Sequence, residues 1–105
     1  MNSIQVVIDR PIGYVDSYGN MYPINYGYVE GVMGGDGEEQ DVYILGVVEP
    51  LKVFEGEVIA VIHRKDDVEE KWVAAPNGVR YSVNQIQEAV HFIEQYFDSS
   101  VRLIS

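Results

Sequence analysis

The sequence predicts a mainly β fold, a small closed or nearly closed five-stranded barrel with one C-terminal α-helix. Three observations predict it. The 105 residues suffice for one hydrophobic core, so a single domain over residues 1–105 is expected. Five short segments rich in β-branched and aromatic residues precede one segment with helical periodicity. A closed barrel also hides the strand edges that so small a sheet would otherwise expose.

The strand candidates come in order along the chain, each bounded by glycine, proline or charged residues. Alternating apolar residues define the first strand candidate, and Pro11 ends it. A turn region over residues 13–21 follows this strand. The third and fourth candidates are rich in valine and isoleucine, and Pro76 stops the fifth. The five candidates are residues 4–9, 26–32, 41–48, 58–63 and 71–75.

A change of period marks the helix, predicted over about residues 83–97. Ile86, Val90, Ile93 and Phe97 recur at steps of three and four residues, as one face of a helix requires. Ser82 followed by Gln85 has the pattern of a capping box, which places the start of the helix.

Composition excludes several classes of function. The chain has no cysteine, so thiolate metal sites and thiol nucleophiles are excluded and hard cations with oxygen ligands are favoured. A formal net charge of -10 opposes binding to nucleic acid and to anionic membranes. The opening segment MNSIQVVIDRP has neither a basic start nor a long apolar run, so we expect a soluble, cytoplasmic protein.

Two acidic segments are candidates for a metal site. In the first, acids cluster in a glycine-rich loop from Asp36, and Asp41 opens an apolar strand on the face of Tyr43. The alternative is an ordinary Asp and Gly turn. The second runs from Asp66 to Glu70 before Lys71, and its alternative is a solvated hairpin tip.

A third segment, residues 22–28, carries three tyrosines in seven positions. Packing in the core or at the surface would account for them. A functional interpretation uses a phenol hydroxyl as a neutral donor to a phosphoryl oxygen.

Taken together, these segments resemble the soluble, barrel-type inorganic pyrophosphatases. The resemblance runs through YPINYGYVEG at 22–31, DGEEQDVYIL at 36–45 and EEKWVAAP at 69–76, and more weakly through HFIEQYF at 91–97. It implies an OB-type barrel, several Mg2+ ions, hydrolysis of pyrophosphate by a metal-activated water, and a homo-oligomer.

The resemblance also implies roles for individual residues. Asp36, Asp41 and Glu69 match metal ligands, and Glu38 matches the carboxylate that deprotonates the attacking water. The remaining ligand falls on Asp66 or Asp67, with Asp66 preferred.

Three further residues match positions that contact the substrate. Lys71 matches a phosphate-binding lysine, and Tyr26 and Tyr96 match tyrosines that touch phosphate. Tyr26 and Lys71 are therefore predicted to take part in catalysis together with Glu38. Asp9 lies near the position of a glutamate that reaches the metal site through water.

The chain departs from the family pattern in its cations. The interval from Pro11 to Met21 is too short for the hairpin that carries a phosphate-binding lysine and arginine in the family, and Phe97 stands where the family has another lysine. Arg10, Arg64 and Lys65 are candidates to replace them.

These observations favour Mg2+-dependent hydrolysis of pyrophosphate or a related phosphoanhydride. The alternative is a catalytically reduced module that binds metal or phosphate. A third hypothesis is a barrel that binds single-stranded nucleic acid through its tyrosines. It is disfavoured, because such binding needs a basic groove beside the aromatic residues.

Overall fold

The computed structural model describes residues 3–104, which form six β-strands and one α-helix. In chain order these are β1 (Ser3–Arg10), β2 (Asn25–Met33), β3 (Glu39–Ile44), β4 (Val53–Arg64), β5 (Glu70–Ala75), α1 (Val83–Glu94) and β6 (Ser99–Leu103).

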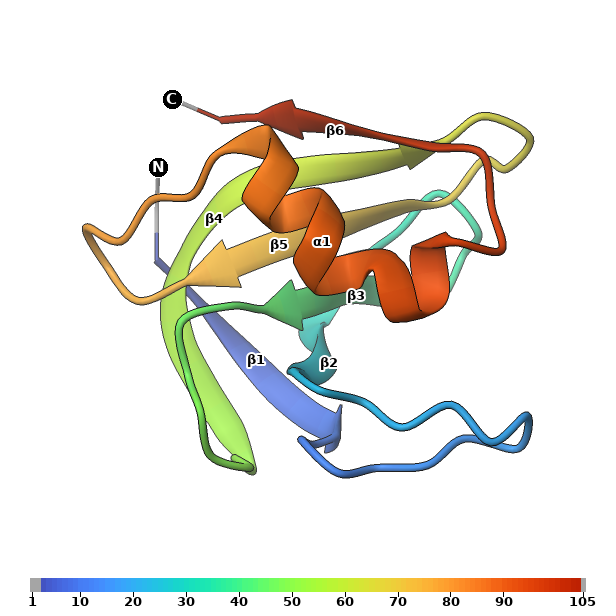
Figure 1. The fold of residues 1–105 in the computed structure, drawn as a ribbon. Helices are drawn as coiled ribbons and strands as arrows, with labels where there is room; N and C mark the ends of the chain where they lie inside the picture. Colours follow the sequence, from blue (N-terminus) through green and yellow to red (C-terminus); the bar gives the residue numbers. More distant parts are fainter. Residues whose placement is uncertain (1–2, 105) are drawn as a thin grey trace.

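Five of the strands close into a barrel, as predicted (Figure 1). The sheet order is β1-β2-β3-β5-β4-β6, and β1 also pairs with β4, which closes the ring. The β3 and β5 strands are parallel neighbours, and the other pairs are antiparallel. The sixth strand, β6, was not predicted; it adds to the outer edge of β4 after the helix has crossed the barrel.

Some element boundaries differ from the predicted ones. The β4 strand begins at Val53 rather than residue 58, because its first residues pair with β1. The β3 strand ends at Ile44 rather than residue 48, because the chain turns at Gly46, whose φ is +85°. The helix ends at Glu94 rather than residue 97, where the chain tightens into a turn. The capping box is confirmed: the Gln85 N–H donates to Ser82 Oγ at 3.1 Å, and the Ser82 N–H donates to Gln85 Oε1 at 2.8 Å.

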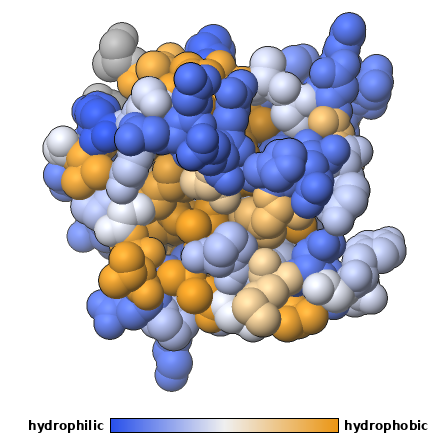
Figure 2. All heavy atoms as spheres, viewed as in Figure 1, coloured by the Kyte–Doolittle hydropathy of each residue, from blue (hydrophilic) through white to orange (hydrophobic). Residues whose placement is uncertain are grey.

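The core consists of two hydrophobic clusters on opposite faces of β3 and β5, as the alternation of side chains along a strand requires. One cluster contains Tyr43 and Val73 and packs against Ile86 and Val90 of α1. The other contains Val42, Ile44 and Ala74 together with residues of β1. The outer face of α1 is hydrophilic, and hydrophobic side chains are visible below it in Figure 2.

The segment between β1 and β2 forms the predicted turn region and has a miniature hairpin of its own. Val15 pairs with Met21, and the Asp16 carboxylate accepts hydrogen bonds from the backbone N–H groups of Tyr18 and Asn20, both at 2.9 Å. We refer to residues 13–21 as the short hairpin. It contains no lysine or arginine.

A β-bulge interrupts β1 just before this hairpin. Ile8 pairs with Gly27 and Arg10 with Tyr26, so Asp9 is an extra residue in the ladder. Bulges change the direction in which neighbouring side chains point.

No helix within residues 3–104 is long and apolar enough to cross a membrane.

Candidate active site

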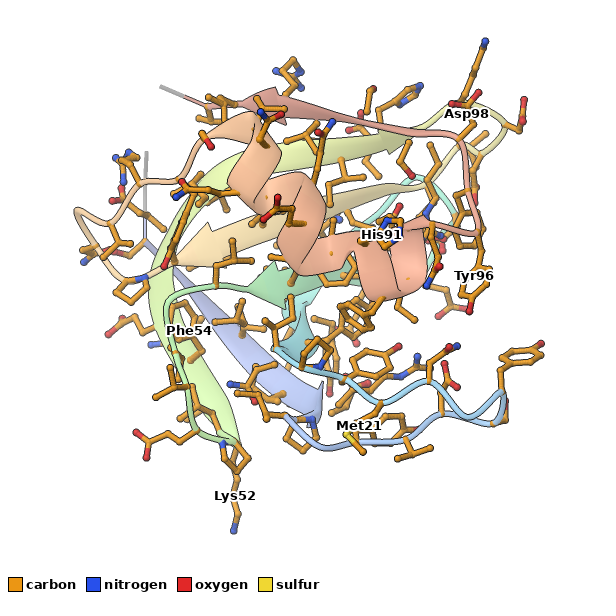
Figure 3. The ribbon with its side chains drawn as sticks, viewed as in Figure 1. Met21, Lys52, Phe54, His91, Tyr96 and Asp98 are labelled. Carbon is orange, nitrogen blue, oxygen red and sulfur yellow. The ribbon has the colours of Figure 1, made fainter. Side chains whose placement is uncertain are left out.

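A cavity of about 700 Å³ opens between the short hairpin, the C-terminal end of α1 and the ends of several barrel strands. In Figure 3, Tyr96 at the end of the helix and Met21 on the hairpin lie on this side of the molecule. Tyrosines and charged side chains dominate its wall, which is formed by Asp9, Arg10, Asp16, Tyr18, Asn20, Tyr22, Tyr26, Asp41, Tyr43, Arg64, Glu69, Lys71, Ile93, Tyr96 and Phe97.

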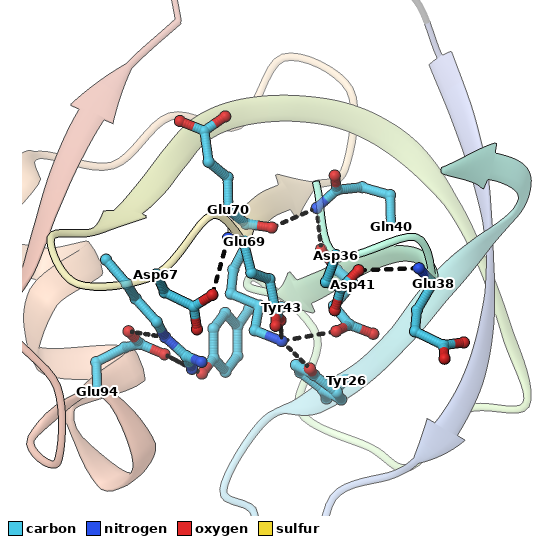
Figure 4. A network of polar contacts seen from close by, with 12 residues as sticks. Tyr26, Asp36, Glu38, Gln40, Asp41, Tyr43, Asp67, Glu69, Glu70 and Glu94 are labelled. Atoms are coloured by element: carbon cyan, nitrogen blue, oxygen red, sulfur yellow. Dashed lines mark hydrogen bonds and ion pairs between the residues drawn. The ribbon is translucent and has the colours of Figure 1, made fainter. Parts of the chain in front are cut away.

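A buried ammonium lies at the centre of the site. Lys71 is only 6% exposed, and its Nζ donates to Asp41 Oδ2 at 2.6 Å and to the Tyr26 hydroxyl at 3.0 Å (Figure 4). It also forms an ion pair with Glu69. The parallel pairing of Val42 with Trp72 sets Asp41 of β3 beside Lys71 of β5 and explains the contact.

Burial alone would lower the pKa of Lys71, because it disfavours the charged form. The contacts with Tyr26, Asp41 and Glu69 outweigh burial and raise the pKa above its usual value, so the side chain is an ammonium at neutral pH. Burial raises the pKa of Tyr26, whose phenol therefore keeps its proton.

The acidic side chains of the site have different environments. Burial raises the pKa of Glu69, the Lys71 ammonium opposes this, and the nearby Asp36 carboxylate raises it further. Burial is also the main reason that the pKa of Asp9 is raised. The Glu38 backbone N–H donates to Asp36 at 3.0 Å and lowers the pKa of that exposed carboxyl.

A second buried network supports the cavity wall. Arg64 donates through Nη2 to Glu94 Oε2 at 2.6 Å and through Nε to Oε1 at 3.1 Å. Tyr43 and Ser99 each donate a hydroxyl to the same carboxylate at 2.6 Å. Four donors therefore converge on Glu94, and they hold its pKa below the usual value although burial opposes this. The Phe97 ring lies 3.7 Å from the Arg64 guanidinium carbon.

The structure brings together five residues that the sequence marked as site candidates: Tyr26, Asp41, Glu69, Lys71 and Tyr96 line one cavity. Asp36 is not part of the cavity wall, but it is close enough to Glu69 to raise the pKa of that side chain.

Two other candidates lie elsewhere. Glu38 is exposed, and its carboxylate is directed away from that of Asp41 (Figure 4). Asp66 is exposed and takes no part in the wall, whereas its neighbour Asp67 accepts a hydrogen bond from the Glu69 N–H at 3.0 Å.

Sequence reasoning missed Tyr43 and Glu94 as parts of this site. Tyr43 lies two residues after Asp41 on the same strand face, which was a usable signal. No local sequence signal pointed to Glu94, because its partner Arg64 is 30 positions away in the chain. Of the proposed replacement cations, Arg10 and Arg64 reach the cavity, and Lys65 is exposed with its Nζ 3.9 Å from Asp98.

The donors at this site suit a hard divalent cation, since Asp36, Asp41 and Glu69 offer only oxygen atoms. Within residues 3–104, no three acidic or histidine side chains are grouped as a ready-made metal site. Instead, Asp41 and Glu69 share the Lys71 ammonium, which shows that their carboxylates are arranged around a positive charge.

The fold and the cavity define a class: small closed β-barrel proteins with a polar cavity on the face of the barrel that the helix covers. The sequence narrows the class, because a model of the inorganic pyrophosphatase family matches residues 5–102. The chain belongs to the inorganic pyrophosphatase family.

Individual relatives agree with this. The inorganic pyrophosphatases of two Xylella fastidiosa strains, 9a5c and Temecula1, are 34% identical to the chain over 96 residues, covering 73% of it and 52% of each relative. The chain thus spans about half the length of these curated relatives.

Solved structures are similar in fold. The inorganic pyrophosphatase of Ehrlichia chaffeensis has a TM-score of 0.72 at 18% identity, covering 97% of this chain and 86% of its own. The inorganic pyrophosphatase of Helicobacter pylori has a TM-score of 0.67 at 21% identity. The match covers 99% of this chain and 83% of the Helicobacter pylori chain.

Proposed function

We propose that the chain hydrolyses pyrophosphate, or a related phosphoanhydride, to phosphate with Mg2+ as cofactor. Membership of the inorganic pyrophosphatase family supports the reaction class. One observation carries the proposal for this chain: an ammonium, a phenol and two carboxylates meet at Lys71 in the wall of an open cavity.

Lys71 and Tyr26 are the proposed donors to phosphate oxygens. A buried ammonium that keeps its proton can stabilise charge that develops on a departing phosphate, because the low dielectric strengthens the interaction. The Tyr26 hydroxyl adds a neutral donor from β2, which is separated from β5 by β3. Tyr96, whose hydroxyl is 3.3 Å from Asn20 Oδ1, would contact the substrate from the cavity mouth.

Asp36, Asp41 and Glu69 are the residues that would hold Mg2+. The ion would supply positive charge to the phosphate oxygens and lower the pKa of a water molecule. Asp66 would join only after a movement of its loop, because it is exposed outside the cavity.

Hydrolysis needs a group that accepts a proton from water as the water oxygen bonds to phosphorus and the bridging P–O bond breaks. Glu38 remains the prediction from the resemblance, but its carboxylate must first turn towards the cavity. Asp9 is already in the wall, and burial raises its pKa, which suits a general base.

One observation favours the alternative, a module that binds metal or phosphate without turnover. Lys71 is already compensated by two carboxylates, so it has no excess positive charge to offer an anion. A substrate phosphate could bind Lys71 only by replacing one of these two carboxylates.

Release of phosphate from pyrophosphate in the presence of Mg2+ tests the proposal. Wild type is compared with Asp41→Asn and with Asp98→Asn, which removes the same charge from an exposed position outside the cavity wall. We expect turnover by wild type and Asp98→Asn and a loss on the order of 100-fold in Asp41→Asn, because the amide removes the charge of a proposed Mg2+ ligand and of a Lys71 partner.

Equal background rates in all three proteins would refute the enzyme. Calorimetry with Mg2+ and imidodiphosphate then tests the module, because binding without turnover is what the module predicts. A homo-oligomer and a cytoplasmic location belong to the same proposal, and light scattering of the purified protein tests the first.

A further inference from the structure

Arg10 enters the cavity because of the β-bulge. In a regular strand, Asp9 and Arg10 would point to opposite faces of the sheet. With Asp9 as the extra residue, Arg10 pairs directly with Tyr26, and both Asp9 and Arg10 line the cavity. The irregularity therefore delivers a cation to the wall that already contains Lys71.

The other cations of the cavity are committed to carboxylates. Lys71 pairs with Asp41 and Glu69, and Arg64 pairs with Glu94 through two nitrogens. Arg10 forms no ion pair within the part of the chain that the structure describes. Of the three cations in this wall, Arg10 is thus the one without a direct carboxylate contact among the described residues, although its charge favours the ionised forms of Asp9 and Asp16 in the same wall.

Three tyrosine rings hold the Arg10 guanidinium in place. Its central carbon lies 5.5 Å from the ring centroid of Tyr14, 5.6 Å from that of Tyr22 and 5.7 Å from that of Tyr26. Its Nη1 donates to the Tyr22 hydroxyl at 2.5 Å. Cation–π contacts at such distances orient the group but leave N–H donors free for another acceptor.

We propose that Arg10 binds a phosphoryl group of the ligand, with the tyrosine cage of Tyr14, Tyr22 and Tyr26 fixing the plane of its guanidinium. Such a planar, pre-oriented fork matches two oxygens of one phosphate, which a lysine ammonium does not. The identity of the anion rests on the proposed function, whereas the position of Arg10 in the cavity wall, without a direct ion pair among the described residues, does not.

The experiment compares wild type, Arg10→Gln, Arg10→Lys and the control Arg102→Gln, which removes the same charge from an exposed strand position. Calorimetry with imidodiphosphate and Mg2+ measures binding, and steady-state kinetics with pyrophosphate measure KM and kcat. We expect Arg10→Gln to weaken binding and raise KM by about 10- to 100-fold, as loss of a charge-assisted hydrogen bond implies. Arg10→Lys should recover part of the loss, and Arg102→Gln should match wild type.

A measurement on wild type guards against misfolding of the variants. The Arg10 Nε–Hε signal in a ¹⁵N NMR spectrum, assigned through Arg10→Lys, should shift when imidodiphosphate is added and the Arg102 signal should not. An unmoved Arg10 signal in a sample that binds the analogue would overturn the inference. So would wild-type affinity in a folded Arg10→Gln.

The outcomes also separate this inference from the proposed function. Turnover by wild type with normal KM in Arg10→Gln overturns the role of Arg10 and leaves the enzyme intact. Binding of imidodiphosphate that depends on Arg10, without any release of phosphate, supports the role of Arg10 and refutes the enzyme.

Discussion

The Arg64–Glu94 network should be among the most sensitive points of the fold, and Glu94→Gln tests it. The two charged side chains are 8% and 6% exposed, and four hydrogen bonds end on one carboxylate. Glutamine keeps the shape but removes the charge, so Arg64 remains buried without a counter-ion. Removing one partner of a buried pair costs about 3–5 kcal/mol.

That loss is a large fraction of the ~5–15 kcal/mol that stabilises a typical domain. For a chain of this size it corresponds to a fall in Tm on the order of 12–40 °C. The control is Glu88→Gln, an exposed change on the same helix, which should stay within about 0.5 kcal/mol of wild type. Adding Arg64→Met to Glu94→Gln should restore part of the stability, because no charge is then left unpaired.

The same network predicts a pH dependence. The folded-state pKa of Glu94 is lowered, so its stabilising effect is complete above the unfolded-state pKa and is lost as pH falls through the folded-state value. The Tm of wild type should therefore fall more steeply than that of Glu94→Gln when melts are carried from neutral pH to below 4.5, the ordinary pKa of a glutamate. Equal Tm values and parallel pH profiles for the two proteins would show that the network contributes nothing.

Three further predictions can be tested by melting experiments. Gly27→Ala should destabilise by about 1–3 kcal/mol, because its Cβ would collide with the Val7 carbonyl across the sheet; an unchanged urea midpoint would contradict this. Ser82→Ala should cost about 1 kcal/mol through loss of the helix cap, and an unaltered Tm would show that the cap is dispensable. Mg2+ should raise the Tm of wild type at neutral pH, because at 100 times its Kd it adds about 2.7 kcal/mol to the free energy of unfolding. Asp41→Asn should lose most of this gain. It should also melt at a lower temperature without metal, because Lys71 loses a partner. No Mg2+ dependence at millimolar concentration would refute the metal site.

Much of the fold was readable from local patterns. Alternating apolar residues predict the five strands, and glycine and proline residues predict where the strands end. The side chains of Ser82 and Gln85 predict the helix cap. All these signals act over a few positions of the sequence. The β6 strand was not readable, because Ser99–Leu103 is short and half polar and gains its structure from pairing with β4.

Site residues on regular strands were easier to predict from the sequence than residues in loops or next to a bulge. Asp41 and Lys71 follow from strand periodicity together with the family resemblance, and their contact is the product of a parallel pairing that no local pattern reveals. Arg10 depended on the bulge, a change of register that sequence alone does not locate. Asp36 and Glu38 lie in a loop whose side-chain directions are set by turn geometry and not by periodicity.

The strand that carries Arg10 is also the one that completes the ring of the barrel. Its residues Ser3–Val7 pair with Val53–Glu57, far along the chain, so closure requires ordering a long intervening segment. The Asp41–Lys71 contact needs only β3 and β5 to be paired, whereas Arg10 reaches the cavity only when β1 is in place. A molecule in which β1 has transiently detached would therefore keep the Asp41–Lys71 contact and lose Arg10 from the cavity. Hydrogen exchange of the β1 amides would then report the fraction of molecules in which Arg10 is in place to receive an anion.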